Sequence, residues 1–592
     1  MKKIFDFRFL IFDWPLADDS RAAFKRKSKI ENLKSKILLA SLALCLVGPQ
    51  GELAAASGAQ RRRGRRAPAT PAQAGAAPQA DARLREATAL ARAGRLEEAE
   101  ALARGAVAAA PHDPAPRALL GVVLDQRGRA AEAEAAYREA LRLDPRSTAA
   151  LANLGVLLVR ARRPEEAVET FEAVLRLAPG HEQATFNLGA LYAARKEFRK
   201  AVPLLERAAG VRAGAAPAGA DPALLVTLAN AYTHTGRPAE AKRLFEQVER
   251  SAGDDPRVLF TLGLGLADAG DYERAARFFA RTDALTPNNY EVLFNLGLAH
   301  FSLGRLDPAQ DALRRAATLR PEEPEVFYRL GLVASARGES ANALGLWQRA
   351  VKLRPVYPEA HFMMAEELVK NRRHETALAF YERAVEQRPE EAVYHVRLGV
   401  AHFRLRGYAR AREVFEGGLR RFPESPVLHY LAGYAARAEG LYDDALRAFR
   451  RALELDPDNA AVLANLGFIA GERGQAEEAE RLLRRALALD PSNYPAHYDL
   501  GRLLVRLKRY DEALPVLERG AGMSRNDPGV HYQLFIAYSR LRRKADAERE
   551  LATFKRLEEA RKQGDAGGAA VVKEGELPPP ETGNPAVKQP RE

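Results

Sequence analysis

One stretch of 34 residues decides the fold of this chain: residues 458–491 read DNAAVLANLGFIAGERGQAEEAERLLRRALALDP. The alanine at position 479 recurs along the chain at intervals of 34 residues, with a single interval of 40. The recurring alanines are Ala99, Ala133, Ala167, Ala201, Ala241, Ala275, Ala309, Ala343, Ala377, Ala411, Ala445, Ala479, Ala513 and Ala547. A fixed period of this length indicates a solenoid, in which each unit buries its apolar face only against its neighbours.

The remainder of the period predicts two helices in each unit. Twelve residues before the alanine stands a second small residue, usually glycine, as at Gly467. Apolar residues around the equivalent position, such as Leu151, Leu154 and Leu158, have the spacing of one helix face. A helix breaker, often glycine, follows, and an acidic segment then opens a second helix, because carboxylates favour the positive end of a helix. A proline such as Pro491 separates the units.

The small and large residues of the period suggest how the helices pack. Small residues at a helix crossing let the two axes approach at the short end of the usual range of about 8–10 Å. Four residues after the alanine stands a large residue, such as Phe449, which we expect to plug the space between units. In length, order and residue type the units resemble the tetratricopeptide repeat family over about residues 81–559. The resemblance implies an all-α fold, a right-handed α-solenoid of about fourteen helix-turn-helix repeats.

Composition and spacing divide the chain into six parts. The first part is a leader at 1–56, which contains a signal-like apolar run at 37–47. A loop inserted between repeats 4 and 5, at 210–221, is rich in Gly, Ala and Pro and is a candidate hinge. The expected parts are a leader at 1–56, a basic and Ala/Pro-rich linker at 57–80, repeats 1–4 at 81–209, the inserted loop at 210–221, repeats 5–14 at 222–562 and a disordered tail at 563–592.

Residues 34–58 are similar to a secretory signal peptide. Two lysines precede the apolar run, a Gly-Pro break follows it, and Ala54, Ala55 and Ala56 suit a processing peptidase. The run has 11 residues, whereas a membrane-spanning helix needs about 20. Export to the periplasm or cell envelope of a bacterium is therefore expected, with an uncleaved membrane anchor as the alternative. About thirty residues precede the signal-like segment, so the true start residue stays open.

The net charge of +13 belongs mostly to the N-terminal end. Residues 1–66 contain 15 Lys or Arg and 6 Asp or Glu, which leaves 76 against 72 in the other residues. The repeats are thus nearly neutral, and we expect no nucleic-acid partner, because backbone binding needs a basic track. Five arginines stand close together in the linker: Arg61, Arg62, Arg63, Arg65 and Arg66. This segment is interpreted either as a solvated linker or as a basic arm that contacts anionic lipid headgroups.

No catalytic, metal-binding or cofactor-binding constellation emerges from the sequence. The single cysteine, Cys45, excludes an intramolecular disulfide and a cysteine-based metal cluster. Five of the 11 histidines occupy one repeat position, four residues before the small residue, so their spacing is that of the repeat and not of a metal motif. Those five, which we interpret as packing histidines, are His361, His395, His429, His497 and His531. Phosphate-binding loops and serine elbows are not found, and we do not expect an enzyme.

The resemblance also implies where a partner binds. In the family, one face of the first helix of each repeat lines a concave groove in which extended peptides or partner helices commonly bind. Counted from the small residue, this face carries the positions three and two before it and one, four and five after it. We call it the groove face. Asparagines two residues before the small residue resemble a ladder that grips a peptide backbone, since an amide both donates and accepts; they are Asn153, Asn187, Asn295 and Asn465.

Aromatic and basic residues complete the candidate groove face. An aromatic column three residues before the small residue fits packing and exposed recognition equally well; the members assigned to the site are Tyr328, Phe362, Tyr430 and Tyr498. Later repeats add arginines that favour an acidic segment, with an ordinary charged surface as the alternative; these are Arg397, Arg404, Arg437, Arg502 and Arg506. The sequence thus predicts a protein-binding scaffold of the cell envelope. An envelope polysaccharide or polymer binder that uses the aromatic column is the alternative.

Overall fold

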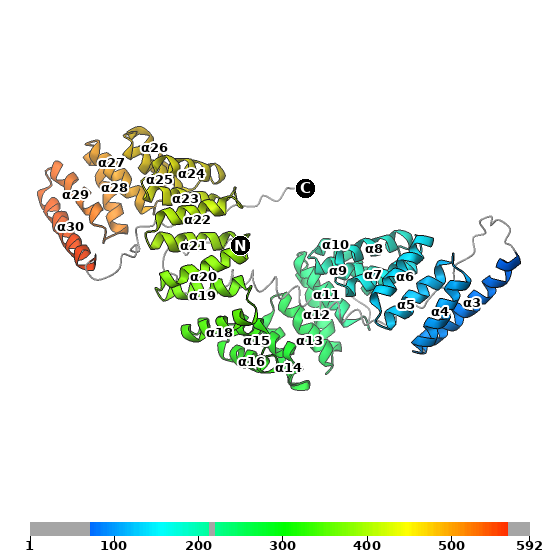
Figure 1. Cartoon of the computed structure of the whole chain (residues 1–592). Helices are drawn as coiled ribbons and strands as arrows, with labels where there is room; N and C mark the ends of the chain where they lie inside the picture. The colour runs from blue at the N-terminus through cyan, green and yellow to red at the C-terminus, as the bar shows by residue number, and fades with distance from the viewer. Residues whose placement is uncertain (1–70, 212–218, 566–592) are drawn as a thin grey trace. The chain divides into compact units, whose positions relative to one another are not determined.

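The computed structural model describes residues 71–211 and 219–565, and this part of the chain contains 28 helices and no strand (Figure 1). The chain divides into two compact units, with the boundary between Arg320 and Pro321. None of the helices in the described ranges is long and apolar enough to span a membrane.

Each unit consists of seven consecutive pairs of helices, one pair to a repeat. The first unit contains α3 (Pro71–Arg92), α4 (Leu96–Ala109), α5 (Pro114–Gln126), α6 (Ala130–Leu143), α7 (Thr148–Arg160), α8 (Pro164–Leu177), α9 (Glu182–Ala194), α10 (Phe198–Ala209), α11 (Pro222–His234), α12 (Pro238–Ser251), α13 (Pro256–Asp268), α14 (Tyr272–Leu285), α15 (Tyr290–Ser302) and α16 (Leu306–Leu319). The second contains α17 (Pro324–Ala336), α18 (Ser340–Leu353), α19 (Pro358–Lys370), α20 (His374–Gln387), α21 (Ala392–Arg404), α22 (Tyr408–Leu419), α23 (Pro426–Ala438), α24 (Tyr442–Leu455), α25 (Ala460–Glu472), α26 (Ala476–Leu489), α27 (Tyr494–Arg506), α28 (Tyr510–Met523), α29 (Pro528–Arg540) and α30 (Lys544–Asp565).

Polar side chains fix where most of the first helices begin. The carboxylate of Asp113 accepts a hydrogen bond from the amide of Ala115 at 3.0 Å, and the side chain of Asn459 accepts one from Val462 at 3.0 Å. Such caps satisfy amides that have no partner inside the helix. Pro114 occupies the first turn of α5, where its missing N–H costs nothing.

The turn between the two helices of a repeat requires one residue in the left-handed backbone region. Gly128 and Gly474 adopt φ values of 76° and 75° there. Glycine has no Cβ and enters this region without strain. Arg162 and Arg406 occupy the same turn position at φ values of 59° and 58°. The turn therefore requires a left-handed backbone conformation, which glycine adopts without strain and which is strained at the two arginines.

The alanine column and the small-residue column both lie inside the helix pairs. Every alanine of the column is at most 5 % exposed. A Cβ on Gly399 would lie 2.2 Å from Cε1 of Phe415, and a Cβ on Gly331 would lie 2.4 Å from Nε1 of Trp347. The large residue thus packs on the small residue of its own repeat. Phe245 also reaches the next repeat, where a Cβ on Gly265 would lie 3.1 Å from its Cε1. The expectation that the large residue fills the space between units therefore holds at Phe245 and stays a prediction for the other repeats.

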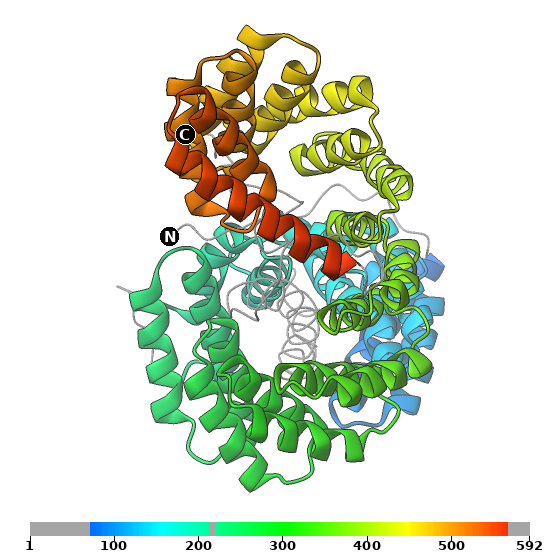
Figure 2. The ribbon, with the colours of Figure 1, turned by 90° about the vertical axis from the view of Figure 1, so that its left-hand side faces the viewer.

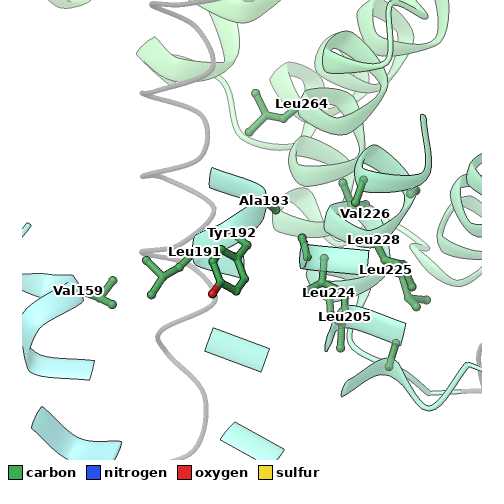
Figure 3. Close-up of a cluster of buried hydrophobic side chains, with 14 of the residues drawn as sticks. Val159, Leu191, Tyr192, Ala193, Leu205, Leu224, Leu225, Val226, Leu228 and Leu264 are labelled. Atoms are coloured by element: carbon green, nitrogen blue, oxygen red, sulfur yellow. The ribbon is translucent and has the colours of Figure 1, made fainter. Parts of the chain in front are cut away.

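First helices and second helices form two layers in each unit. First helices of successive repeats contact one another: α5 contacts α7, and α25 contacts α27. Within each unit, a second helix also contacts the first helix of the next repeat. The apolar side chains between the layers form buried clusters, of which the largest in the first unit extends from Val122 to Ala312 and one in the second unit from Val396 to Ala547. Figure 3 shows part of the cluster in the first unit, where Leu191 of α9, Leu205 of α10 and Leu228 of α11 are buried.

Arginines that begin the second helices connect successive repeats. Nη1 of Arg163 lies 2.8 Å from Glu134 of the preceding repeat, and Nη2 lies 2.6 Å from Glu166 of its own helix. Arg509, at the start of α28, makes the equivalent pair of contacts, with Glu480 of the preceding repeat and with Glu512 of its own helix. A guanidinium can bridge two carboxylates because its donors are arranged as a fixed fork. The sequence analysis did not predict this link between repeats.

The final helix differs in length from the other second helices. α30 has 22 residues and packs on α29 (Figure 2). Glu550 of α30 lies 2.7 Å from Nδ1 of His531 on α29. α30 is rich in charged residues, which suits the last repeat of an array, because a terminal repeat needs a polar outer face.

Three expected domain limits can be compared with the structure. α3 begins at Pro71, ten residues before the expected start of the repeats, since alanine is the best helix former and supplies half of residues 71–80. Across the inserted loop, Glu206 accepts hydrogen bonds from Tyr232 and Arg237 at 2.8 Å each. The division between units lies at Arg320 and not at the loop, and a hinge in 210–221 stays a prediction. The leader at 1–56, the linker up to residue 70 and the tail from 566 lie outside the described residues.

Candidate functional site

Two of the four asparagines of the predicted ladder are hydrogen-bonded to their own helices. Asn187 of α9 and Asn465 of α25 are 6 % and 3 % exposed, and Asn153 of α7 is half-buried. Nδ2 of Asn465 donates to the carbonyl oxygen of Ala461 at 2.8 Å. Asn295 of α15 makes the same kind of bond to its own helix, at 2.7 Å. A ladder for a peptide backbone therefore stays a prediction, and two of its amides already have local acceptors.

Three of the four aromatic candidates are buried. Tyr328, Phe362 and Tyr430 are 2 %, 4 % and 4 % exposed. The ring of Phe362 lies 5.8 Å from that of Tyr381, and the ring of Tyr430 lies 6.0 Å from that of Phe449. Both contacts are to the large residue of the same repeat, which favours the packing role. Tyr498 of α27 is half-buried and stacks on Tyr494.

Arg397 of α21 is held by a carboxylate of the preceding first helix. Its Nε lies 3.3 Å from Oε1 of Glu366, and the same oxygen accepts a hydrogen bond from the hydroxyl of Tyr381 at 2.5 Å. Burial, followed by the charge of Glu366, raises the pKa of Tyr381 well above its usual range. Arg404 is half-buried two turns further along α21. The charge of Glu366 offsets that of Arg397, so this part of the groove face is not simply basic.

The other three arginines come together on α23, α25 and α27. The guanidinium carbon of Arg437 lies 4.7 Å from the ring centre of Tyr434 and 4.8 Å from that of Phe468. The guanidinium carbon of Arg502 lies 5.2 Å from the same Phe468 ring. Both arginines therefore rest on one phenylalanine, as a cation rests on an aromatic face. We call Arg437, Phe468, Glu472, Asp499, Arg502 and Arg506 the arginine cluster.

Two carboxylates partly neutralise the arginine cluster. Nη2 of Arg502 lies 2.9 Å from Glu472 and 3.4 Å from Asp499. Nη2 of Arg506 lies 4.0 Å from Glu472, and Nη1 of Arg506 donates to the carbonyl oxygen of Gly471 at 3.1 Å. With all groups ionised, the three arginines and two carboxylates carry a net charge of +1.

The side chain of Asp499 is the least solvated charge of the arginine cluster. Asp499 is 8 % exposed, and its burial raises the pKa of its carboxyl to about 6 against the opposing effect of Arg502. Arg437 and Arg506 also favour the ionised form, while Glu472 disfavours it. Arg502 lies closer to Glu472 than to Asp499, so Asp499 gains only part of the attraction.

The arginine cluster keeps donors that the described part of the protein does not use. The side chain of Arg437 makes no hydrogen bond or ion pair with any described residue; it rests on the two rings, and its charge acts on Asp499. Nε of Arg502 also lacks a hydrogen-bond partner among the described residues, but this atom is buried, so a ligand would meet Arg502 at its terminal nitrogens. Because guanidinium groups match carboxylates with paired donors, this arrangement can take an additional anionic group.

The recurring histidines fasten the turns between repeats. Nε2 of His395 donates to the carbonyl oxygen of Pro389 at 2.9 Å, and Nε2 of His429 donates to that of Pro423 at 2.9 Å. A carbonyl oxygen can only accept, so Nε2 carries the hydrogen in each case. No group of histidine, cysteine and carboxylate side chains in the described ranges has the arrangement to hold a metal ion.

Sequence analysis missed the aromatic part of the arginine cluster. Phe468 lies one residue after the small Gly467 and Tyr434 one residue after Gly433, which are positions of the groove face. The search considered aromatic residues only three positions before the small residue. A comparison of all five groove-face positions would have found both rings next to Arg437.

The repeats identify the family of this chain. Two family models described as tetratricopeptide repeat match it, one at residues 84–148, 118–182, 152–220, 328–392, 362–426 and 396–460, and the other at 192–259, 266–330, 436–486 and 470–532. These matches cover well over half of the chain. The chain belongs to the tetratricopeptide repeat family, whose members generally serve as non-catalytic scaffolds for protein–protein interaction.

Solved structures similar to this chain include other repeat proteins. The chain is 15 % identical to a chain in the APC/C hetero-tetramer Cut9–Hcn1, with 79 % of this chain and 98 % of that chain covered and a TM-score of 0.32. It is 16 % identical to yeast Tom70, with 79 % and 96 % covered and a TM-score of 0.29. It is 17 % identical to the C-terminal part of a TPR repeat-containing protein from Cytophaga hutchinsonii, with 41 % and 99 % covered and a TM-score of 0.37. A search of curated proteins found no match.

Proposed function

We propose that this protein is a non-catalytic scaffold that binds peptide or helix segments of partner proteins on its groove face. The observation that carries the proposal is the arginine cluster, where the guanidinium groups of Arg437 on α23 and Arg502 on α27 stack on Phe468 of α25, and Arg437 makes no hydrogen bond with a described residue. Membership of the tetratricopeptide repeat family supports protein partners in general.

Capture of partners by variants of the full chain tests this proposal. Tagged wild-type protein is compared with the double variant Arg437→Glu and Arg502→Glu and with the control Arg481→Glu. Arg481 is 68 % exposed on α26, outside the groove face, and among the described residues its guanidinium group pairs with Glu478 of its own helix alone. The proposal expects a partner protein that the control retains and the double variant loses. Equal capture by all three proteins would place the binding surface elsewhere.

The polymer-binding alternative needs aromatic rings that a sugar can reach. Tyr328, Phe362 and Tyr430 are almost fully buried, so this role is less well supported than protein binding. Binding of an envelope polysaccharide that depends on the half-buried Tyr498 would restore it.

We further propose that the scaffold works in the bacterial cell envelope. The support is the signal-like segment at 34–58 alone. If this segment directs export, the five arginines at 61–66 follow it closely in the sequence, where anionic lipid headgroups could attract them. Fractionation of cells that express the full chain or a chain without residues 1–56 tests the location. Retention of both forms in the cytosol would contradict it.

A further inference from the structure

The arginine cluster offers two positive groups with spare donors to the same ligand. Arg437 of α23 and Arg502 of α27 both stack on one ring, that of Phe468 on α25. Stacking on this ring restricts both guanidinium groups before any ligand arrives, so little conformational freedom is lost on binding. Each group can therefore donate to an incoming carboxylate at a small entropic cost.

Asp499 and Glu472 occupy part of this donor capacity in the free protein. Nη2 of Arg502 is shared between Glu472 at 2.9 Å and Asp499 at 3.4 Å, whereas Nε of the same arginine has no partner among the described residues. A ligand carboxylate that approaches Arg502 meets these two like charges. The internal carboxylates are thus competitors of an acidic ligand.

We propose that the arginine cluster binds the carboxylates of an acidic segment of a partner protein, and that Asp499 competes with this segment for Arg502. The proposal rests on the proposed scaffold function and adds the chemical class of its partner and a control over binding. Charge complementarity carries the choice of occupant, because the arginine cluster has a net charge of +1 that rises to +2 when Asp499 is neutral. The repeats as a whole, with 76 basic and 72 acidic residues after position 66, do not attract polyanions in general.

The competition makes binding depend on pH. The carboxyl of Asp499 has a pKa of about 6, so it is mostly ionised at pH 7.5 and about half protonated near pH 6. The charged groups that act on it are Arg502 and Arg506 of α27, Glu472 of α25 and Arg437 of α23, and no histidine is among them. Acidic peptides keep their charge in this interval, since an ordinary glutamate has a pKa of about 4.3. Mild acid therefore protonates Asp499, so that it no longer competes for Arg502, while the carboxylates of the ligand stay ionised.

Fluorescence anisotropy with a labelled octaglutamate peptide and the full chain tests the proposal. We expect octaglutamate to bind and octaglutamine not to bind, and affinity to rise about threefold from pH 7.5 to pH 5.8 as Asp499 loses its charge. Arg437→Gln and Arg502→Gln each weaken binding about tenfold, since a hydrogen bond to a charged group is lost. The matched control Arg481→Gln leaves it unchanged.

Two further variants separate competition from a general change in charge. Asp499→Asn binds about fivefold more tightly at pH 7.5 and loses the pH dependence. Glu472→Gln removes the same charge from the arginine cluster, also binds more tightly, and keeps the pH dependence. Tighter binding cannot result from misfolding, so the test survives a loss of stability in the arginine variants.

Distinct outcomes overturn distinct parts of the account. Equal binding of octaglutamate and octaglutamine, or equal affinity of Arg437→Gln and Arg481→Gln, overturns the acidic-segment site. Tighter binding of a single-stranded oligonucleotide through the same arginines overturns the choice of a protein segment. An Asp499→Asn variant that keeps the wild-type pH dependence overturns the competition. The scaffold function falls only if the capture experiment also shows no partner that depends on Arg437 and Arg502.

Discussion

Replacement of Asp499 by asparagine should stabilise the protein at neutral pH. Asparagine has nearly the shape of the neutral acid and carries no charge to bury. The carboxyl of Asp499 is 8 % exposed, and its burial outweighs the attraction of Arg502. The substitution removes the cost of a buried charge while it keeps the volume of the side chain.

The size of the effect follows from the pKa of Asp499 in the folded protein. An aspartate has a pKa of about 3.9 in an unfolded chain, against about 6 in the folded one. Ionisation of this group therefore lowers the free energy of unfolding by about 3 kcal/mol above pH 7. Because the folded-state pKa is the higher one, stability is lost as pH rises from about 4 to about 6. We expect Asp499→Asn to gain about 3 kcal/mol over the wild type at pH 8 and about 1.5 kcal/mol at pH 5.

Hydrogen exchange of amides in α25 and α27 is the appropriate assay. A long repeat array does not unfold in a single step, so a local measurement is better than one global midpoint. A gain of about 3 kcal/mol corresponds to roughly a hundredfold slower exchange where these helices open together. Wild type and variant are compared at the same pH, which cancels intrinsic exchange rates.

Asp458→Asn is the matched control for this experiment. The side chain of Asp458 is 80 % exposed and lies 3.6 Å from Arg485, so its loss should change stability by less than about 0.5 kcal/mol. Faster exchange in Asp499→Asn than in the wild type at pH 8 would refute the reasoning. Such a result would mean that the ion pair with Arg502 contributes more than burial costs.

Three further predictions concern the repeats themselves. Arg237→Met should lower the local stability around α10 and α12 by about 1 kcal/mol, because Arg237 joins Glu206 of the preceding repeat to Glu240 and rests on the Tyr232 ring; hydrogen exchange of amides in these two helices measures this, and unchanged exchange would show that the link between repeats does not contribute to stability. Gly399→Ala should cost about 2 kcal/mol, because the new Cβ would lie 2.2 Å from the Phe415 ring, whereas Gly345→Ala, with nothing within 4 Å, should gain about 0.5 kcal/mol; similar melting temperatures for both would contradict the packing account. Arg406→Gly should gain about 1 kcal/mol, since φ is 58° there, and a lower melting temperature would show that the side chain outweighs the strain.

The fold could be predicted closely from the sequence because the same pattern of small, large and helix-breaking residues recurs from unit to unit. The alanine column, the small residue and the proline at the end of each unit predict the helix pairs that the structure contains. The position of Phe415 was harder to predict, because spacing places a ring on a helix but does not say whether it faces its own repeat or the next.

The candidate site was predicted less completely than the fold. The arginines and their opposing carboxylates were found at groove-face positions, but not their contacts. Phe468 contacts both Arg437, 31 residues before it in the sequence, and Arg502, 34 residues after it. Such neighbours depend on the rotation and stacking of successive repeats, which a period of 34 residues does not specify.

Light-induced crosslinking from the groove face in living cells tests the central claim most directly. A photoreactive phenylalanine derivative replaces Phe468 in the arginine cluster or, as the control, Arg481 on α26. We expect a crosslinked partner protein from position 468, lost when Arg437→Glu and Arg502→Glu are added, and none from position 481. A partner that crosslinks from position 481 and not from position 468 would show that the protein binds through its second-helix layer, and would contradict the assignment of the groove face.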